Sequence, residues 1–575
     1  MWAKDWREKI WSQIGQPWDV LVIGGGITGA GILREAARGG LRVLLVEQRD
    51  FAWGTSSRSS KLVHGGLRYL ATGQVGITLT SVREREHLLE DGPGLIDPLG
   101  FLMATHRGAK PGRLTYGAGL AVYDLMALQW SHRYYSAEEF RMLVPHLAGE
   151  DLQGGFRYED AQTDDSRLVL RVIQEAAADG GAALNYVSAD ELLLRDGKVV
   201  GARLRDHITG ETAEVFAKAV INATGAFADR LRLQVGAEAR IRPLRGSHLV
   251  FAAWRLPMAQ AVTFVHPLDG RPVFAFPWEG VTLVGTTDLD HEAPLTDEPG
   301  ISPQEVAYLM AAVAYQFPSR GLTLDDIVAT YAGVRPVIGT GKDDPSKESR
   351  EYVVWQENGL LTVTGGKLTT FRAVAVDTLR MLHERLPDMP SVKTDVPVLN
   401  PVNIELPGSL SETIRRRLLG RYGVDALELV NAALPGELEC IPGTLTLWAE
   451  LRWAARAEGV VHLDDLLLRR VRLGLILPNG GAALMPRFRQ ICQPELGWDD
   501  ARWDAEEAAY LRLWRNCYSL PARDGIPDWA AMLAAARTAV KPQKRRFTRA
   551  FVFLVILVAG VVLLARARRR AASNQ

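Results

Sequence analysis

Cysteine is scarce in this chain, and neither sign of charge is in excess. Its 575 residues include three cysteines, Cys440, Cys492 and Cys517, which show no CxxC spacing. This pattern excludes a disulfide framework and offers no cysteine-rich set for zinc or an iron–sulfur cluster, so no metal is expected. Lys and Arg together number 67, and so do Asp and Glu, so no overall field would recruit nucleic acid. A chain of this length exceeds one hydrophobic core, and two or three domains are expected.

A secretory leader is not expected either, because residues 1–18 are charged and contain no continuous apolar core. In this stretch Trp2, Trp6, Ile10 and Ile14 recur at every fourth position. That spacing predicts a short amphipathic helix as an amino-terminal extension. Packing of this helix against the body is the favoured interpretation, and membrane contact is the alternative.

Long uncharged runs are missing except at residues 550–565, which read AFVFLVILVAGVVLLA and are flanked on both sides by basic residues. As a helix this run would extend about 24 Å, slightly less than the ~30 Å hydrocarbon layer of a bilayer. We therefore expect residues 547–566 to form a membrane-anchor or transmembrane helix, because the charged flanks fit a buried core helix poorly. Since both flanks are basic, the positive-inside rule leaves its orientation open.

Between these ends the pattern of apolar and polar residues changes once. From residue 19 to about residue 395, strand-like apolar runs alternate with helical patterns, which predicts an α/β domain with a parallel or mixed sheet. From about residue 400 to 540 long helical patterns prevail, and they predict a helical carboxy-terminal domain. Its clearest helices are expected at residues 410–422, 445–457 and 505–520.

Residues 19–48 have the layout of a dinucleotide-binding unit: a strand, a glycine turn, a helix and a second strand. Gly24, Gly26 and Gly29 form GxGxxG at the first junction, and Glu47 ends the second strand. The glycines permit a tight turn, close approach of a pyrophosphate and close helix–strand packing, while the helix amino terminus offers N–H groups to phosphates. Glu47 is placed to accept hydrogen bonds from the adenosine ribose. A purely structural glycine turn is disfavoured, because strand, helix and acidic residue all stand at the required spacing.

The fingerprint alone fits NAD as well as FAD. It occurs once, since the nearest rival, Gly117–Gly119, follows no predicted strand. An enzyme of this size with one dinucleotide site more naturally holds a flavin and passes its electrons to a second acceptor. Residues 219–229, AVINATGAFAD, predict a strand whose end at Thr224 and Gly225 returns to the cofactor. FAD is therefore the expected cofactor.

A third segment, residues 360–372, reads LLTVTGGKLTTFR. It predicts a strand, a turn through Gly365 and Gly366, and a helix that begins near Leu368. Because helix amino termini favour negative charge, this one could face the flavin pyrimidine edge. A simple strand–helix turn explains the segment equally well.

With these segments in place, the chain resembles the FAD-dependent glycerol-3-phosphate dehydrogenases. The most specific element is SSKLVHGGLRYL at residues 59–70, and the residues from Ala449 onward resemble that family's helical cap domain. Five further segments follow in family order: DDSRLVL at 164–170, RGSHLVF at 245–251, VGTTD at 284–288, YAGVRP at 331–336 and TGGKLTT at 364–370. The amino-terminal tryptophan-rich stretch and the apolar tail lie outside the family core, and the cysteine-rich extension of the anaerobic branch is not present.

The resemblance implies a Rossmann-like FAD-binding domain of the D-amino-acid-oxidase and glutathione-reductase type, with an interleaved β-rich substrate domain. The FAD-binding segments would be about 19–84, 150–225 and 340–395, and the substrate-binding segments about 85–149 and 226–339. FAD would be bound noncovalently. Beyond the residues already named, the resemblance implies these cofactor contacts: Ser59, Ser60, Lys61, His64, Gly65, Gly66, Lys367, Leu368 and Thr369.

The implied reaction is the oxidation of sn-glycerol 3-phosphate to dihydroxyacetone phosphate. A dianionic phosphate suits fork-shaped arginine donors, and the resemblance implies a substrate clamp of Arg68, Tyr69, Arg335, Arg350 and Lys367. Removal of the C2 hydroxyl proton suits a neutral histidine, for which His248 and His64 are the candidates. Arg335 could also stabilise the forming alkoxide, and the sequence leaves these catalytic roles undivided.

An apolar anchor would hold the flavin domain at the cytoplasmic face of the cell membrane, next to the lipid bilayer in which quinones dissolve. A membrane quinone is therefore the expected acceptor, and a homodimer is the candidate assembly. Three alternatives stay open: an oxygen-using glycerophosphate oxidase, an oxidase of a carboxylate substrate, and a flavin-binding scaffold or redox sensor without turnover. The tail disfavours the first, the basic set disfavours the second, and the intact clamp and His248 disfavour the third.

Overall fold

The computed structural model describes residues 2, 5–71, 73–108, 112–149, 151–339, 351–383, 386–389 and 392–539. The predicted anchor at residues 547–566 and the predicted substrate-binding residue Arg350 lie outside these residues. The side chain of Arg68 is likewise outside what is described. Within the described residues, no helix is both long and apolar enough to cross a bilayer.

The first sheet is the expected dinucleotide-binding sheet. Its parallel core has the order β18 (Leu360–Thr364), β10 (Thr212–Asn222), β1 (Trp18–Ile23), β2 (Val43–Val46) and β7 (Ala182–Leu184). Antiparallel additions are β17 (Val353–Glu357) beside β18 and the pair β8 (Val187–Arg195) and β9 (Lys198–Asp206) beside β10. Strands covered on both faces are apolar throughout, which explains the continuous runs VLVI and VLLV.

Three helices pack together over one face of this sheet: α2 (Ile27–Arg38), α7 (Asp165–Ala178) and α10 (Phe371–Leu382). The other face is covered by β8, β9, α8 (Ala228–Gln234) and the amino-terminal segment. In that segment α1 (Trp6–Trp11) is only six residues long. Trp2 nevertheless stacks on Phe51 at 5.5 Å, and Arg7 forms an ion pair of 2.9 Å with Asp206. The predicted packing of this extension against the body is therefore confirmed.

The second sheet is mostly antiparallel and is interleaved in sequence with the first. Its order is β15 (Leu289–Asp290), β11 (Ile241–Ala252), β14 (Val281–Gly285), β13 (Pro272–Trp278), β12 (Ala261–Val265), β4 (Ile96–His106), β6 (Leu152–Thr163) and β3 (Leu62–Val63). The strand β16 (Ile327–Ile338) also pairs with β11, and β5 (Arg133–Ser136) pairs with β6.

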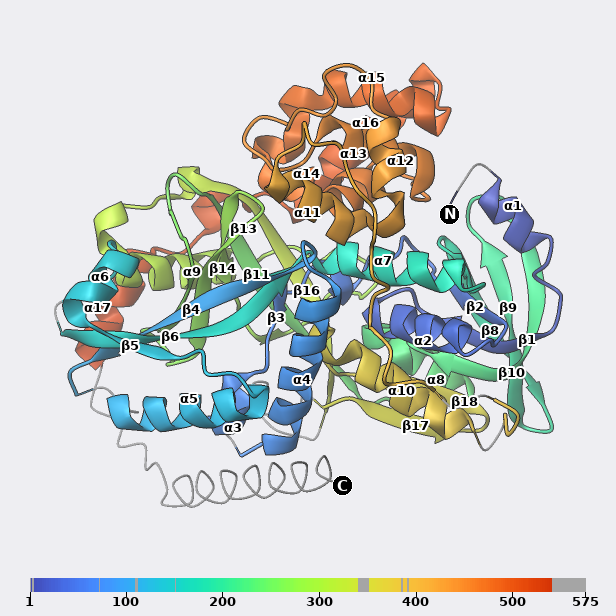
Figure 1. Cartoon of the computed structure of the whole chain (residues 1–575), viewed down its shortest axis with the longest axis horizontal. Helices are drawn as coiled ribbons and strands as arrows, with labels where there is room; N and C mark the ends of the chain where they lie inside the picture. The colour runs from blue at the N-terminus through green and yellow to red at the C-terminus, as the bar shows by residue number, and fades with distance from the viewer. Residues whose placement is uncertain are drawn as a thin grey trace.

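The two faces of the second sheet differ. One face packs against α6 (Ala137–Leu143), α9 (Pro303–Gln316) and residues near α17 (Trp529–Ala539). The other face contributes to a core shared with α4 (Val75–Asp91), α5 (Arg113–Ala127) and the carboxy-terminal helices. The short helix α3 (Leu67–Ala71) lies against both α4 and α5. Figure 1 shows the two sheets side by side, with the carboxy-terminal helices above their junction.

The carboxy-terminal part is helical, as predicted. Its helices are α11 (Glu412–Tyr422), α12 (Ala426–Asn431), α13 (Trp448–Ala457), α14 (Leu473–Ile476), α15 (Met485–Leu496) and α16 (Asp500–Cys517). The helix expected from residue 445 begins at Trp448 because Glu450 accepts a hydrogen bond of 2.9 Å from the Leu447 N–H. The last begins earlier than residue 505, since Asp499 accepts from the Arg502 N–H at 2.7 Å and caps the helix at that point.

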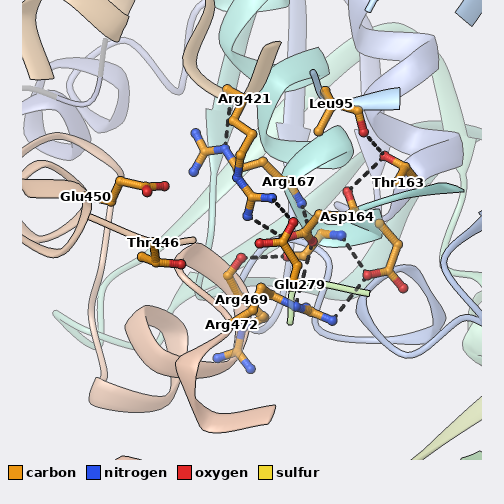
Figure 2. A network of polar contacts seen from close by, with 12 residues as sticks. Leu95, Thr163, Asp164, Arg167, Glu279, Arg421, Thr446, Glu450, Arg469 and Arg472 are labelled. Carbon is orange, nitrogen blue, oxygen red and sulfur yellow. Dashed lines mark hydrogen bonds and ion pairs between the residues drawn. The ribbon is translucent and has the colours of Figure 1, made fainter. Parts of the chain in front are cut away.

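Buried ion pairs join this helical cap to the body (Figure 2). Arg421 of α11 reaches Asp164 at 2.6 Å and Glu279 at 3.2 Å, and Arg167 of α7 pairs with Glu458. All of these side chains except Glu279 are at most 3% exposed. A buried pair contributes little net stability, but loss of one partner is costly, so such pairs fix how the cap docks. The segment DDSRLVL thus supplies Asp164 and Arg167 to cap docking.

Candidate active site

A cavity of about 1900 Å³ lies between the two sheets and collects most of the predicted site residues. The predicted residues that line it are Gly24, Gly26, Glu47, Ser59, Ser60, His64, Gly66, Tyr69, Thr224, Gly225, His248, Arg335, Gly365, Gly366, Lys367, Leu368 and Thr369. Gly29, Lys61 and Gly65 are described but are not among its lining residues. Segments from residue 24 to residue 369 therefore meet at one place.

The glycines of the fingerprint are required by their surroundings. Gly24 has φ +115°, and a Cβ there would lie 2.6 Å from the Ala223 carbonyl oxygen. A Cβ on Gly29 would lie 1.9 Å from the Gly24 oxygen, so this residue serves helix–strand packing. Gly26 stands at the N-cap of α2 without a capping side chain, beside the cavity. This is the cradle that a pyrophosphate needs at a helix amino terminus.

Glu47 is held toward this cradle by the backbone. Its carboxylate accepts hydrogen bonds from the Gly25 N–H at 2.7 Å and the Arg49 N–H at 2.9 Å. Burial raises the pKa of Glu47. Each carboxylate oxygen still has lone-pair capacity for a ribose hydroxyl. The residues present therefore fit the adenosine half of FAD.

The third predicted turn closes against the segment that holds His64. Gly365 and Gly366 have φ +81° and +78°, and a short 3-10 turn then leads into α10. The Thr369 hydroxyl accepts from the His64 N–H at 3.2 Å and lies 3.3 Å from the His64 carbonyl oxygen. Lys367 donates to the Ser81 hydroxyl at 3.0 Å and lies 3.8 Å from the centre of the Tyr69 ring. Two predicted clamp residues, Lys367 and Tyr69, are thus in contact.

His248 of β11 is buried in the cavity wall. Its ring stacks on Tyr331 with centroids 4.5 Å apart, and its Nε2 lies 2.8 Å from the Ser60 Oγ. Its Nδ1 is buried and has no hydrogen-bond partner among the described residues. Burial, reinforced by the charges of Lys61 and Arg335, lowers the pKa of His248 well below its usual value. The imidazole is therefore neutral near pH 7 and able to accept a proton.

Arg335 of β16 is oriented by the segment VGTTD. Its Nη2 donates to the Thr287 carbonyl oxygen and to Asp288 Oδ1, both at 3.0 Å. A Cβ on Gly246 would come within 2.6 Å of the same nitrogen, so the glycine of RGSH makes room for the guanidinium. Arg335 is thus a fixed cation in the wall that also contains His248.

Lys61 has a different environment from the one predicted. Its Nζ donates to Asp165 at 3.0 Å and to the Ser57 carbonyl oxygen at 3.0 Å, and both charged side chains are fully buried. Burial and the nearby Arg472 lower the pKa of Lys61 to about 8. Since the side chain points toward Asp165 behind the wall, a cofactor contact could come only from its backbone.

Two contacts in this site were missed by the sequence reasoning. Ser60 was assigned to the cofactor, yet its hydroxyl contacts His248. Asp288, which holds Arg335, received no role although its segment was singled out. The sequence shows an acidic residue at the end of the segment VGTTD, but no spacing pairs Asp288 with Arg335.

The fold and the site define a flavin-dependent oxidoreductase of the D-amino-acid-oxidase type. Residues 19–372 match the family described as FAD dependent oxidoreductase, and residues 367–503 match the C-terminal domain of alpha-glycerophosphate oxidase. The aerobic glycerol-3-phosphate dehydrogenase of Staphylococcus epidermidis is 37% identical over 487 residues, covering 79% of this chain and 86% of that protein. The chain belongs to the family of FAD-dependent glycerol-3-phosphate dehydrogenases.

Further comparisons are consistent with this family and its fold. The aerobic glycerol-3-phosphate dehydrogenase of Staphylococcus aureus is 36% identical over 485 residues, covering 79% of this chain and 86% of that protein. The crystal structure of the Bacillus halodurans glycerol-3-phosphate dehydrogenase with FAD has a TM-score of 0.71 at 29% identity, covering 89% of this chain and 98% of that one. An L-alpha-glycerophosphate oxidase from Mycoplasma pneumoniae with FAD bound shares the fold, at a TM-score of 0.53 and 20% identity over 68% of this chain and 100% of that one.

Proposed function

We propose that this chain oxidises sn-glycerol 3-phosphate to dihydroxyacetone phosphate, with bound FAD as the immediate oxidant and a membrane quinone as the final acceptor. Relatives at 36–37% identity carry the name of this dehydrogenase. The observation that carries the proposal is the neutral, buried His248 in a cavity wall that also contains the fixed cation Arg335. A base beside a cation is what alcohol oxidation at C2 requires.

FAD, when bound, supplies the hydride acceptor of this reaction. Nε2 of His248 takes the C2 hydroxyl proton, either directly or through the Ser60 hydroxyl 2.8 Å away. Arg335, held by Asp288, stabilises the negative charge that develops on the C2 oxygen. Lys367 beside Tyr69 offers a point charge for the phosphate. Roles for His64, Arg68 and Arg350 in binding stay predictions.

The acceptor and the location are proposed on the sequence alone. The uncharged run at residues 550–565 with its basic flanks suits attachment to the cytoplasmic face of the cell membrane. A quinone dissolved in that bilayer would be within reach of the flavin domain. Assembly as a homodimer stays a prediction.

The experiment that tests the substrate is anaerobic bleaching of the flavin absorbance by sn-glycerol 3-phosphate, with glycerol and lactate as controls. The proposal expects rapid bleaching by the phosphate ester and none by the controls. A protein that keeps its oxidised flavin with the phosphate ester, but is bleached by a carboxylate, would contradict the substrate assignment.

A second candidate is a glycerophosphate oxidase, which would give the electrons to oxygen. The match of residues 367–503 to the C-terminal domain of alpha-glycerophosphate oxidase favours keeping it. The two candidates differ after flavin reduction. Reduced protein mixed with oxygen should reoxidise quickly and form hydrogen peroxide if it is an oxidase, and slowly if a quinone is the acceptor.

A further inference from the structure

The cavity continues beyond the site described so far, along one row of the second sheet. Starting at His248 on β11, the residues directly opposite one another are Gly285, Phe274, Thr263 and Met103. Phe274, Thr263 and Met103 line the same cavity as His248. Since neighbouring strands are about 4.8 Å apart, Phe274 stands about 10 Å and Met103 about 19 Å from His248. No side chain stands at Gly285, over which the His248 ring lies.

Part of this extension is lined by aromatic and thioether side chains. The side chains that line it are Phe101, Met103, Tyr116 and Phe274. We call these four side chains, together with the hydroxyls of Thr263 and Tyr158, the acceptor arm. Phe101 meets Phe274 edge to face at 6.1 Å and contacts Tyr158 at 5.3 Å. Tyr116, from α5, adds a further aromatic side chain to this lining.

The two hydroxyls give the arm hydrogen-bonding capacity. Thr263 Oγ1 is buried, and among the described residues its polar neighbour is the Tyr158 hydroxyl. Tyr158 is 5% exposed, and burial raises its pKa, so its hydroxyl stays protonated. Because a hydroxyl both donates and accepts, this pair can still bond a ligand. Two donors set in aromatic and thioether walls suit a flat apolar ring that carries oxygen acceptors.

The substrate does not suit this arm. A three-carbon phosphate ester is short and doubly charged, and a substrate at His248 cannot extend about 19 Å to Met103. A second ligand of different chemistry therefore suits the arm better.

We infer that the acceptor arm binds the ring of a quinone, the acceptor of the proposed function on which this inference rests. One C2 oxidation releases two electrons and two protons. The quinone gains both and leaves as the quinol, so the balance closes without another reactant. The carbonyl oxygens accept hydrogen bonds from Thr263 and Tyr158, and the ring packs among Phe101, Phe274 and Met103.

The outer face of α5 provides an apolar approach to the arm. Leu114 is 88% exposed, and Leu128 and Trp130 just beyond the helix are 59% and 69% exposed. The exposed Arg113 adds positive charge beside Leu114, at the other end of the helix from Leu128 and Trp130. Tryptophan and arginine next to exposed leucines suit the interface of an anionic bilayer. Tyr116 on the same helix lines the cavity of the arm.

The test isolates the second half of the reaction. FAD-loaded protein is reduced with dithionite, mixed anaerobically with a short-chain ubiquinone or with the dye phenazine methosulfate, and followed by flavin absorbance. Thr263→Val removes a hydroxyl at constant shape, and Met103→Trp fills the arm. Met142→Trp on α6, 79% exposed, and Thr212→Val, at the exposed start of β10, are matched controls.

Both arm variants should slow reoxidation by the quinone at least about tenfold, roughly the loss of one good hydrogen bond. Reoxidation by the dye and bleaching by sn-glycerol 3-phosphate should stay at the rates of the controls. Unchanged rates of reoxidation by the quinone in Thr263→Val and Met103→Trp, or an equal slowing with the dye, would overturn the assignment of the arm as a quinone site. If Met103→Trp loses its FAD, the rate of reoxidation of Thr263→Val by the quinone decides the test alone. Wild-type protein that is not bleached by the ester, yet shows arm-dependent quinone rates, would instead overturn the proposed substrate.

Discussion

The imidazole of His248 lies flat on the ring of Tyr331, with the two planes 8° apart and the centroids at 4.5 Å. The Tyr331 hydroxyl donates to the Ser59 carbonyl oxygen at 3.0 Å, and the next residue, Ser60, contacts His248 Nε2. The loop that contains Ser59 and Ser60 is thereby joined to the second sheet at His248. A base held on two sides in this way loses little rotational freedom when substrate binds.

Replacement of His248 is expected to reduce the rate of flavin bleaching by about 10²–10⁴-fold, the usual contribution of a general base. His248→Asn should keep the FAD spectrum, because the fingerprint glycines and Glu47 are untouched. Stopped-flow bleaching by sn-glycerol 3-phosphate measures the rate. A variant that bleaches as fast as the wild type would exclude His248 as the base.

The pH dependence follows from the same environment. Burial and nearby cations depress the pKa of His248 well below 6.5, the ordinary histidine value. The imidazole of the folded protein is therefore already neutral at pH 6.5. Bleaching should therefore be nearly constant from pH 6.5 to 8 and fall only at lower pH. An acidic limb centred at or above pH 6.5 would show that another group, such as His64, controls the reaction.

Arg335→Ala should lower kcat/KM for the phosphate ester by about 10²-fold or more, because a fixed donor to a developing oxyanion is lost. Asp288→Asn tests how Arg335 is held, since the carboxylate contacts its Nη2 at 3.0 Å. That variant should raise KM and lower kcat less than Arg335→Ala does. Equal flavin content in both proteins is the control, and normal turnover by Arg335→Ala would contradict the clamp.

The parts of this site that the sequence predicted are local ones. The glycine turn, the acid after the second strand and the turn at residues 365–366 depend on residues close together in the chain, where spacing alone constrains geometry. Ser60 and His248 are 188 positions apart, and Asp164 and Arg421 are 257 apart. Such pairs are formed by tertiary packing, which a single sequence does not specify. The acceptor arm was missed because its members look like ordinary core residues in five different helices and strands.

The cap is expected to depend on its buried ion pairs. Asp164→Ala leaves Arg421 near Glu279 but without its closest carboxylate, in a place where both partners are at most 3% exposed. Loss of one partner of such a pair costs about 3–5 kcal/mol of unfolding free energy. Denaturant unfolding measures it, and Asp500→Ala, which breaks an exposed pair with Arg489, should leave the midpoint nearly unchanged. Equal midpoints for the two variants would argue against the docking role.

Membrane attachment can be assigned to the tail or to α5 by paired variants. Removal of residues 550–575 should abolish binding to anionic vesicles if the apolar run is the anchor. Leu114→Glu places a charge on a side chain that is 88% exposed at the approach to the acceptor arm, and Leu434→Glu, 54% exposed in the cap, is its control. With the tail present, Leu114→Glu should slow turnover of long-chain quinone in vesicles and spare a soluble short-chain quinone, because only the former must arrive from the bilayer. If Leu114→Glu and Leu434→Glu turn over vesicle quinone equally well, α5 does not face the bilayer, and a quinone would have to enter the arm by another side.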